Sequence, residues 1–434
     1  MGKVKGKKIN VVTLGCSKNV VDSEHVMAQL AAAGYDVVFD SNGTEVRTVV
    51  VNTCGFIGDA KEESINTILG FVRAKEEGAI DRLFVIGCLS ERYAEELRRE
   101  IPEVDAYFGA RDFSGVVRAL TGSEGGAPAT ERMLTTPGHY AYLKISEGCN
   151  WRCAYCAIPL IRGPHVSVPE EQVLEDAGRL VRRGVKELIV VAQDTTYYGV
   201  DLYGERRLGR LLRRLAAMPG VEWVRLHYTY PTGFPDDVLA AMREEPKICR
   251  YIDIPLQHIA DRQLSAMRRG ITKRGTEELI ARLRREVPGI AIRTTLLVGF
   301  PGESEEDFAE LTDFVERQRF ERLGVFPYSA EEGTPSAEMA DDVPEEVKQA
   351  RVERIMELQR NISHEANVAR IGRKLRVVVD RREGDYYVAR SEYDSPEVDQ
   401  EILIPVAEGR LLPGEFRVVV VTACEEYDLY GRLA

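Results

Sequence analysis

Residues 149–156 read Cys149-Asn-Trp-Arg-Cys153-Ala-Tyr-Cys156 and place three thiols in one short segment. Thiolates this close can converge on one centre from a single loop, and soft sulfur ligands select zinc or iron–sulfur clusters. Structural zinc sites normally close with four protein ligands, but no matching fourth Cys or His is nearby, His165 being the closest. A cubane cluster held by three cysteines leaves one iron open to a substrate or cofactor. The segment therefore predicts a [4Fe–4S] cluster on Cys149, Cys153 and Cys156, with three incidental thiols as the alternative.

The cysteine segment directly follows a predicted strand at 141–145, the first of a series of strand-like runs that alternate with helical patterns. The other runs are at 187–192, 223–228, 251–254, 290–298 and 322–325. Strand–helix alternation at this spacing predicts parallel strands, and this many repeats predict a partial or complete (β/α) barrel. The chemistry of such a barrel lies where its strands end at their carboxyl side, so the cysteines would lie at the mouth of the first repeat. A long charged helix is expected at 344–370.

Polar or glycine-rich residues follow three of these predicted strands. Gln193 and Asp194 end one strand, Gln257 and His258 end another, and Gly299 begins a Gly-Phe-Pro-Gly run after a third. Residues at the strand ends of a barrel are typical of site residues, so contacts with a cofactor or substrate are expected. For Gly299, a plain strand-to-helix turn is the alternative.

The first 120 residues contain a separate set of strand-like runs, at 9–14, 48–52 and 82–86. Helical patterns lie between them at 22–33 and 60–77. Compact apolar runs are typical of buried parallel strands, and their alternation with helices predicts a doubly wound parallel sheet. The small, polar, glycine-rich residues 121–130 are typical of a linker.

Three distant cysteines share one context in this N-terminal part. Cys16, Cys54 and Cys88 each end a predicted strand and each precede a helix. Residues just past the carboxyl ends of parallel strands gather at one edge of the sheet, so these thiols can meet in space. Glycines beside each cysteine allow tight turns and close approach of the backbone. We predict a second cluster here, with three buried free thiols as the alternative. Cys249 and Cys424 have no partners at ligand spacing and are expected to be structural.

Composition and charge exclude several classes of protein. The 434 residues are 44% hydrophobic and 29% charged, which is typical of a globular protein. No apolar run approaches the roughly 18 residues that span a membrane, and no signal core follows the basic start, so we expect a cytoplasmic protein without a membrane partner. Lys and Arg number 58 against 70 Asp and Glu, for a net charge of −12. This balance favours a neutral or basic partner.

The C-terminal residues 372–434 change to a β-rich pattern punctuated by turns. Strand-like runs predict a small antiparallel barrel and lie at 375–379, 386–389, 401–404 and 417–422. This part holds 9 Lys and Arg against 13 Asp and Glu, a net charge of −4. Phosphate contacts need positive charge, so an acidic barrel suits a basic protein partner better than RNA. A local basic stripe on an acidic domain is the alternative.

Taken in chain order, these patterns predict an α/β multidomain protein. A doubly wound parallel α/β domain is expected at 1–130, a partial (β/α) barrel at 135–365, and a small antiparallel β-barrel at 368–434.

The C-x3-C-x2-C segment, with the aromatic Tyr155 before its last cysteine, resembles the radical S-adenosylmethionine enzymes. In that superfamily the open iron binds S-adenosylmethionine, and one electron from the cluster cleaves the sulfonium to give a 5′-deoxyadenosyl radical. The resemblance implies S-adenosylmethionine as a cofactor and an external one-electron donor as a partner. It also implies cofactor contacts from strand-end and loop residues, namely Tyr155, Gln193, Asp194, Gln257 and Gly299.

The segments around the distant cysteines resemble the methylthiotransferases, which convert C–H to C–SCH3 on RNA or protein. These segments are Leu14-Gly-Cys-Ser-Lys-Asn-Val-Val-Asp-Ser-Glu24, Asn52-Thr-Cys-Gly-Phe-Ile57 and Gly87-Cys-Leu-Ser-Glu-Arg-Tyr93. Together with the central cysteines and a C-terminal part similar to a TRAM domain, the resemblance covers nearly the whole chain. It implies two [4Fe–4S] clusters, each with one open iron.

One motif separates the two branches of that family. Gly15-Cys-Ser-Lys-Asn19 is similar to the Gly-Cys-Pro-Lys-Asn of the branch that modifies an aspartate of ribosomal protein twelve of the small subunit, whereas the tRNA branch typically has Gly-Cys-Gln-Met-Asn. Ser17 departs from the usual Pro, and Val168 stands where an Arg is expected. Three further segments resemble the ribosomal-protein branch: Gln193-Asp-Thr-Thr-Tyr-Tyr-Gly199, Asp253-Ile-Pro-Leu-Gln-His258 and Pro327-Tyr-Ser-Ala-Glu-Glu-Gly-Thr-Pro335.

The resemblance implies methylthiolation of the β-carbon of an aspartate. The adenosyl radical would remove a hydrogen, and the carbon radical would take a methylated sulfur held at the N-terminal cluster, with a second S-adenosylmethionine supplying the methyl group. No catalytic side chain beyond the cluster ligands is expected. The implied partner is the ribosomal protein or the ribosome, with nucleic acid not as substrate. The alternatives are methylthiolation of a modified adenosine in tRNA and a zinc-stabilised scaffold that binds ribosomes without chemistry.

Overall fold

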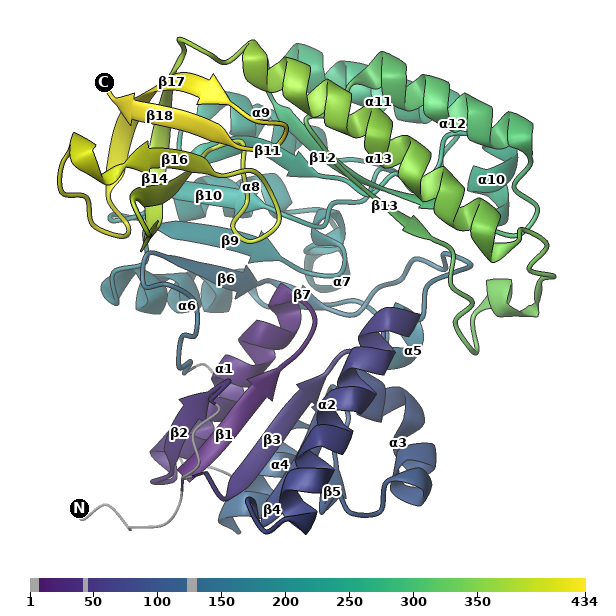
Figure 1. The fold of residues 1–434 in the computed structure, drawn as a ribbon, viewed down its shortest axis with the longest axis vertical. Coiled ribbons are helices and arrows are strands. Elements are labelled where there is room, and N and C mark those ends of the chain that lie inside the picture. The colour runs from purple at the N-terminus through teal and green to yellow at the C-terminus, as the bar shows by residue number, and fades with distance from the viewer. Residues whose placement is uncertain (1–7, 42–45, 123–130) are drawn as a thin grey trace.

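The computed structural model describes residues 8–41, 46–122 and 131–434. Figure 1 shows three parts along the chain: an N-terminal sheet, a larger central sheet, both with helices, and a small C-terminal barrel. The predicted linker at 121–130 lies outside the described residues from position 123 onward. Across the described ranges, every helix is too short or too polar to cross a membrane.

The N-terminal sheet has five parallel strands in the order β2-β1-β3-β4-β5. The strands are β1 (Lys8–Thr13), β2 (Asp36–Phe39), β3 (Thr48–Thr53), β4 (Arg82–Gly87) and β5 (Ala106–Tyr107). The helices are α1 (Ser17–Ala32), α2 (Gly58–Glu76), α3 (Cys88–Glu100) and α4 (Phe113–Thr121). The three predicted strands and both predicted helices are present. The two edge strands, β2 and β5, are not predicted because they are too short to give an apolar run.

Both faces of the N-terminal sheet are covered. Val50 and Phe84 face α1 and α4, whereas their strand neighbours Val51 and Val85 face α2 and α3. Alternate residues of a strand point to opposite faces, so strands that are apolar on both sides need helices on both sides. The arrangement confirms the predicted doubly wound sheet.

The central sheet has six strands in the order β13-β12-β11-β10-β9-β6, with every neighbouring pair parallel. The strands are β6 (Tyr140–Lys144), β9 (Glu187–Val191), β10 (Trp223–Leu226), β11 (Ile248–Asp253), β12 (Ala291–Val298) and β13 (Arg322–Pro327). All six predicted strands are therefore present. The sheet is curved and open, so the partial form of the predicted barrel is the one observed.

Helices cover one face of the central sheet and share its main core. They are α6 (Glu170–Arg182), α8 (Leu208–Ala216), α9 (Asp236–Glu244), α11 (Lys273–Glu286), α12 (Glu305–Gln318) and α13 (Glu345–Val368). The long charged helix expected at 344–370 is α13, and its residues Ile355 and Ile362 are buried in this core.

Shorter elements surround the strand ends of the central sheet. They are the pair β7 (Ser146–Glu147) and β8 (Val166–Ser167), the helices α5 (Ile158–Arg162), α7 (Val200–Tyr203) and α10 (Asp261–Ala266), and the 3-10 turns η1 (Thr195–Tyr197) and η2 (Pro335–Glu338).

The C-terminal barrel is closed by five strands in the order β14-β15-β16-β18-β17. They are β14 (Lys374–Glu383), β15 (Tyr386–Ser391), β16 (Ile402–Pro405), β17 (Phe416–Cys424) and β18 (Leu429–Leu433), with the 3-10 turn η3 (Val406–Glu408). Two details correct the predicted antiparallel barrel. The fifth strand, β18, is not predicted, and it pairs with β16 in parallel while the other pairs are antiparallel.

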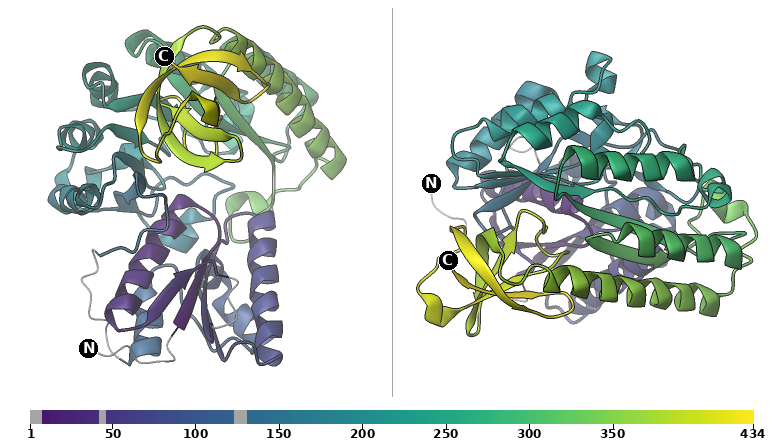
Figure 2. Two further views of the ribbon diagram at one scale, coloured as in Figure 1. Left: turned by 60° about the vertical axis from the view of Figure 1, so that its left-hand side comes forward. Right: turned by 90° about the horizontal axis from the view of Figure 1, so that it is seen from above.

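The face of the central sheet without helices is covered from two directions. The C-terminal barrel lies toward one end of the molecule and the N-terminal sheet at the other, as Figure 1 and the left view of Figure 2 show. Val21 of α1 packs on Tyr142 and Val191 of the central sheet. On the side of the C-terminal barrel, the Nε2 of His227, just past β10, forms a hydrogen bond with the Oγ of Ser395 at 2.9 Å. His227 is thus a buried, hydrogen-bonded histidine of the core.

Candidate functional site

The N-terminal cysteines lie where three neighbouring strands end. Cys16, Cys54 and Cys88 follow β1, β3 and β4, which are adjacent in the sheet. A Cβ built on Gly15 would come within 3.0 Å of the Cys54 Sγ, and one built on Gly55 would come within 2.9 Å of the Cys88 carbonyl carbon. The structure therefore brings these strand ends into contact, and only glycine allows so close an approach.

Positive groups surround the N-terminal cysteines. Burial alone would raise the pKa of the Cys16 thiol, but Lys18, the backbone N–H of Asn19 and Arg162 outweigh it and lower that pKa. Burial dominates at Cys88 and raises its pKa to about 12, although Arg162 acts in the opposite direction. Neighbouring thiolates contribute to the raised pKa of Cys88, which places all three sulfurs within electrostatic reach of one another.

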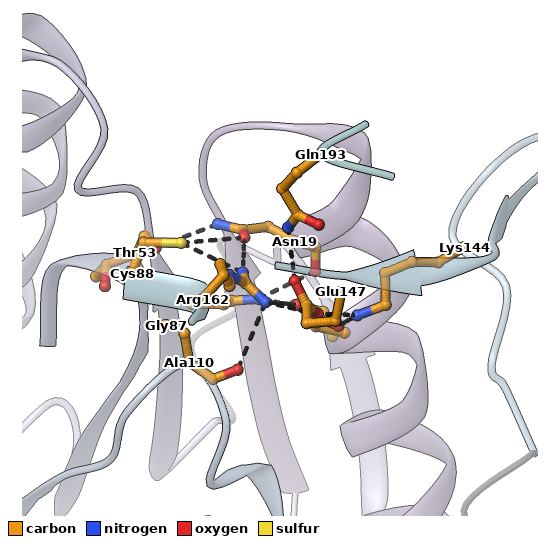
Figure 3. Close-up of polar contacts among 12 residues, drawn as sticks. Asn19, Thr53, Gly87, Cys88, Ala110, Lys144, Glu147, Arg162 and Gln193 are labelled. Carbon is orange, nitrogen blue, oxygen red and sulfur yellow. Dashed lines mark hydrogen bonds and ion pairs between the residues drawn. The ribbon is translucent and has the colours of Figure 1, made fainter. Parts of the chain in front are cut away.

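Arg162 joins the N-terminal sheet to the central sheet through a buried polar network, which Figure 3 shows. Its Nη2 donates to the Cys88 Sγ at 3.2 Å and to the Asn19 Oδ1 at 2.7 Å. Its Nη1 donates to Asp22 at 2.8 Å and to Glu147 at 3.3 Å. Glu147 also accepts from Lys144 at 2.8 Å. A guanidinium can hold several acceptors at once in fixed directions, so one side chain ties a cysteine of the first group to the edge of the second sheet.

The second cysteine group lies on the loop between β7 and α5. The Cys149 N–H donates to the Gly163 carbonyl at 3.1 Å, and the Ala154 N–H donates to the Met267 carbonyl at 3.0 Å, so both ends of the loop are anchored. Gly148 has a positive φ of 76°, and a Cβ there would lie 2.1 Å from the Pro164 carbonyl oxygen. The loop can therefore follow this path only with glycine at position 148.

Aromatic and cationic side chains enclose Cys153. Its Sγ lies 3.4 Å from the Tyr230 hydroxyl and 3.4 Å from the Arg269 Nη1. Tyr230 stacks on Trp151 with ring centroids 4.1 Å apart. Burial and the neighbouring Cys153 thiolate raise the pKa of Cys156. Thiols that resist ionisation in this way become ligands when a metal supplies positive charge, so the donor set fits an iron–sulfur cluster.

The predicted cofactor-binding residues fall into two groups. Tyr155, Gln193 and Asp194 border the cysteine loop. Tyr155 accepts from Arg269 at 3.2 Å, Asp194 accepts from the Trp151 indole at 2.7 Å, and Gln193 donates to Glu147 at 2.5 Å. The Gln193 Oε1 is buried without a hydrogen-bond partner among the described residues, which leaves an acceptor for a bound molecule.

The other two predicted residues, Gln257 and Gly299, are less accessible to a cofactor. Gln257 has a positive φ of 72° and forms a backbone bridge to β12, with its N–H donating to Thr295 at 2.8 Å. Gly299 also has a positive φ, of 71°, but the space beside it is filled by Lys348 of α13, whose Cγ lies 2.3 Å from where a Cβ would be. Gly299 therefore accommodates a helix side chain in this structure.

Sequence reasoning missed three residues that contact the site. Lys18 stands inside the motif at 15–19, and Arg162 follows the last cysteine of the loop by six residues, but nothing in the sequence shows that these side chains are buried. Arg269 stands in an ordinary Arg-Arg-Gly turn after α10 and carries no sequence signal. Of the remaining cysteines, Cys249 is buried in β11 and Cys424 ends β17, and neither belongs to a group of three potential metal ligands among the residues described.

The described residues contain no group of three His, Cys, Asp or Glu side chains close enough to hold a single metal ion. A cluster makes a different demand from a single ion, because each of its cysteines binds a separate iron. The ligand sets at both sites remain predictions on these grounds.

Three protein-family models match the chain and follow its three parts. Residues 8–109 match the uncharacterized protein family UPF0004, residues 143–315 match the radical SAM superfamily, and residues 371–434 match the TRAM domain. The fold and the cysteine loop thus define a radical S-adenosylmethionine enzyme.

Similar curated proteins extend over the full length of the chain. The ribosomal protein uS12 methylthiotransferase RimO of Bacteroides thetaiotaomicron is 53% identical over 431 residues, which is 99% of either chain. The RimO of Porphyromonas gingivalis is 54% identical over 428 residues, 98% of this chain and 99% of that one. The chain belongs to the family of ribosomal protein uS12 methylthiotransferases, RimO. It is a methylthiotransferase that uses S-adenosylmethionine and two [4Fe–4S] clusters, as the sequence predicts.

Solved structures support the fold at greater distance. The radical S-adenosylmethionine methyltransferase TsrM of Kitasatospora setae, solved with cobalamin and a [4Fe–4S] cluster, is 15% identical with a TM-score of 0.55 and covers 76% of this chain and 74% of its own. OxsB, a cobalamin-dependent S-adenosylmethionine radical enzyme, is 12% identical with a TM-score of 0.50 and covers 81% of this chain and 56% of its own. These likenesses support the predicted fold class.

Proposed function

We propose that this chain attaches a methylthio group to the β-carbon of an aspartate in ribosomal protein uS12. One observation carries the proposal beyond the family: the two cysteine groups are next to each other. Arg162 donates to the Cys88 sulfur at 3.2 Å, and the carbonyl of the next residue, Gly163, accepts the Cys149 N–H at 3.1 Å. Sulfur held at one group could therefore reach a carbon positioned at the other without crossing open solvent.

The cysteines are assigned as two ligand sets. Cys16, Cys54 and Cys88 hold the first [4Fe–4S] cluster, and Cys149, Cys153 and Cys156 hold the second, where S-adenosylmethionine binds. The bound cofactor supplies a 5′-deoxyadenosyl radical, which is the oxidant for an unactivated C–H bond. The lowered pKa of Cys16 and the donors on Cys88 and Cys153 are consistent with anionic sulfur at both places.

The polar residues at the strand ends are assigned to S-adenosylmethionine. Tyr155, Gln193 and Asp194 border the cysteine loop, and we assign the Gln193 Oε1, which has no hydrogen-bond partner among the described residues, as an acceptor for the cofactor's amino group. Gln257 and Gly299 lie at the ends of further strands, and the Lys348 stem beside Gly299 would have to move for the cofactor to reach that backbone. The chain's own part is to position the cofactor and exclude water rather than to move protons.

The three parts of the chain are assigned separate tasks. The unit at 1–130 holds the sulfur-donating cluster, the unit at 135–365 generates the radical, and the unit at 368–434 recruits uS12, free or within the ribosome. An external one-electron donor reduces the clusters, and we place the reaction in the cytoplasm, where ribosomes are.

Mass spectrometry tests this function directly. The reconstituted, reduced enzyme is incubated anaerobically with S-adenosylmethionine and a sulfide source, in one tube with uS12 and in another with hypomodified tRNA. We expect a gain of one methylthio group on an aspartate of uS12 and none on the tRNA. A gain on tRNA alone would overturn the substrate, and a preparation that holds zinc without iron or acid-labile sulfide would overturn the chemistry.

A further inference from the structure

Lys18 carries a buried positive charge, and none of the described carboxylates lies within salt-bridge distance of it. Its residue is 8% exposed, and its Nζ lies 3.2 Å from the centre of the Tyr228 ring. Within the described ranges, the ammonium has no salt bridge within 4.0 Å. Buried ammonium groups are normally paired with a carboxylate because leaving water is costly, so one without a carboxylate partner marks a place where an anion would be stabilised.

The Asp253 carboxylate helps to raise the pKa of Lys18, but its oxygens are already occupied. Asp253, at the end of β11, accepts the Tyr228 N–H at 3.1 Å with one oxygen and the Arg293 guanidinium at 3.0 Å with the other. Lys144, the other buried lysine of this region, has a different environment because it pairs with Asp22 and with Glu147. The contrast shows that the fold can supply a carboxylate to a lysine here and does not supply one to Lys18.

A second donor without a partner lies next to Lys18. The Ser17 hydroxyl is buried and has no hydrogen-bond partner among the residues described. Ser17 and Lys18 form the start of α1, whose first turn contains no acidic residue. An ammonium and a hydroxyl on adjacent residues at a helix N-terminus match the two oxygens of a carboxylate.

Lys18 also lies between the two cysteine groups. On one side it is two residues from Cys16. On the other side its contact residue Tyr228 accepts the Thr195 N–H at 2.9 Å, and the preceding Asp194 holds the indole of Trp151 in the second cysteine loop. A molecule bound at Lys18 therefore lies at the strand ends of the central sheet, between the sulfur site and the radical site.

We propose that Lys18, assisted by Ser17, binds the side-chain carboxylate of the target aspartate and thereby selects an acidic side chain as substrate. This inference rests on the proposed function and names the residue that recognises the reacting side chain. A carboxylate held by charge-assisted hydrogen bonds fixes the β-carbon one bond away, which is the atom that reacts. A neutral amide or a nucleobase gains no such pairing in the same place.

Binding measurements on both sides of the pair test the proposal. The target aspartate is located from the methylthiolated peptide, and uS12 is prepared with that aspartate or with Asn in its place. Affinity for both forms is measured anaerobically with S-adenosylmethionine and no reductant, so that no turnover occurs. Wild-type enzyme, Lys18→Met and Lys18→Gln are compared at equal iron and sulfide content. Lys75→Met, which removes an ammonium paired with Asp105 far from the cysteines, is the control.

The expected result is that replacing Lys18 removes both the tight binding of uS12 and the preference for its aspartate form. Wild-type enzyme and Lys75→Met bind the aspartate form roughly ten- to a hundredfold more tightly than the asparagine form, as expected for a charge-assisted contact. Lys18→Met and Lys18→Gln bind both forms equally and as weakly as wild type binds the asparagine form. A merely structural lysine would weaken both forms together and leave the preference intact.

Two outcomes overturn the inference, and the first needs no variant of the enzyme. Equal affinity of wild-type enzyme for the two substrates shows that no carboxylate is recognised, and a preference retained in the Lys18 variants assigns recognition elsewhere. Failure of the proposed function looks different, because wild-type enzyme would then leave uS12 unmodified under reducing conditions.

Discussion

Glu187 is the buried charge that joins the central sheet to the C-terminal barrel. It is the first residue of β9 and is fully buried. The Arg225 Nε donates to its Oε1 at 2.8 Å, and the Arg390 Nη2 from β15 forms an ion pair with its Oε2 at 2.5 Å, although this second contact lacks hydrogen-bond alignment. Both arginines are buried as well, so replacing Glu187 leaves two cations with too few anions.

Glu187→Gln removes the charge and keeps the shape, because Gln mimics the protonated acid. Burial alone would raise the pKa of Glu187, but Arg390 and Arg225 outweigh it and lower the pKa from 4.5 to about 2. A tenfold change in proton affinity corresponds to about 1.4 kcal/mol, so the charged form favours the folded state by about 3 kcal/mol. Measured losses on breaking buried ion pairs are of the same order, about 3–5 kcal/mol.

Urea unfolding of the apo-protein measures this loss. Trp223 packs edge-on against Phe416 of the C-terminal barrel at 4.9 Å, so tryptophan fluorescence reports on the junction. At pH 7 we expect Glu187→Gln to lower the free energy of unfolding by about 3 kcal/mol. Because the folded-state pKa is lowered, this stabilisation is complete above about pH 4.5 and declines as the pH falls toward 2. The difference between wild type and variant should therefore shrink in acid.

An exposed ion pair across the same junction provides the control. Glu222 pairs with Arg376 of β14 at 2.6 Å, and both side chains are 43% exposed. Glu222→Gln should cost less than about 1 kcal/mol, as surface ion pairs do. If Glu187→Gln costs no more than Glu222→Gln, or if its effect does not change with pH, the reasoning from burial and charge is refuted.

The remaining predictions concern the cysteine sites. Cys16→Ala should lower the iron content and abolish methylthio transfer while the reduced enzyme still cleaves S-adenosylmethionine, as measured by iron analysis and chromatography of 5′-deoxyadenosine. Arg162→Met should lower the free energy of unfolding by about 3–5 kcal/mol and also reduce cluster loading, because Arg162 contacts both Asp22 and the Cys88 sulfur. The control is Arg132→Met, which breaks a buried ion pair with Glu24 of α1 away from the cysteines and should affect stability alone. Gly87→Ala places a Cβ 2.6 Å from a backbone oxygen at φ 103° and should cost about 1–3 kcal/mol in urea unfolding, whereas Gly34→Ala, at φ 90° in open space, should cost less.

Each of these predictions has an outcome that contradicts it. Full iron loading in the Cys16 variant would remove that residue from the ligand set. Equal cluster loading in the two arginine variants would show that the Arg162 contact with sulfur is incidental. Equal losses in the two glycine variants would mean that φ alone, and not the crowded strand end, sets the cost.

The sequence predicts the strands of the two sheets well because most of them are apolar on both sides. β3 and β4, with Val50 and Phe84 buried under helices, leave a continuous apolar run in the sequence. Strands without a continuous apolar run are not predicted from the sequence. β5 has two residues, and β18 carries a Gly and an Arg that interrupt its pattern, so neither stands out from a loop.

In the candidate site, too, only the residues with a visible sequence pattern could be predicted. Cysteines are rare and their spacing is visible in the sequence, whereas the groups that set their electrostatics are ordinary charged residues. Arg162 and Arg269 are each buried against a cysteine by contacts more than 70 residues away in sequence. Only the folded chain distinguishes these arginines from the exposed ones, such as Arg274, that form surface ion pairs.

The charge of the C-terminal barrel illustrates how folding changes the meaning of a composition. The excess of acidic residues at 372–434 suggests a surface that attracts a basic protein. Three of those acids instead face arginines of the central sheet: Glu392 pairs with Arg250 at 3.0 Å, Asp394 with Arg322, and Asp399 with Arg293 at 3.4 Å. These carboxylates hold the barrel against the sheet and are not available to a partner. Two arginines of the barrel, Arg376 and Arg390, are likewise paired with Glu222 and Glu187 of the central part. Because several charges of both signs are used inside the molecule, the composition of the barrel does not describe the surface that a partner meets, and the preference for uS12 over RNA rests first on the full-length relatives.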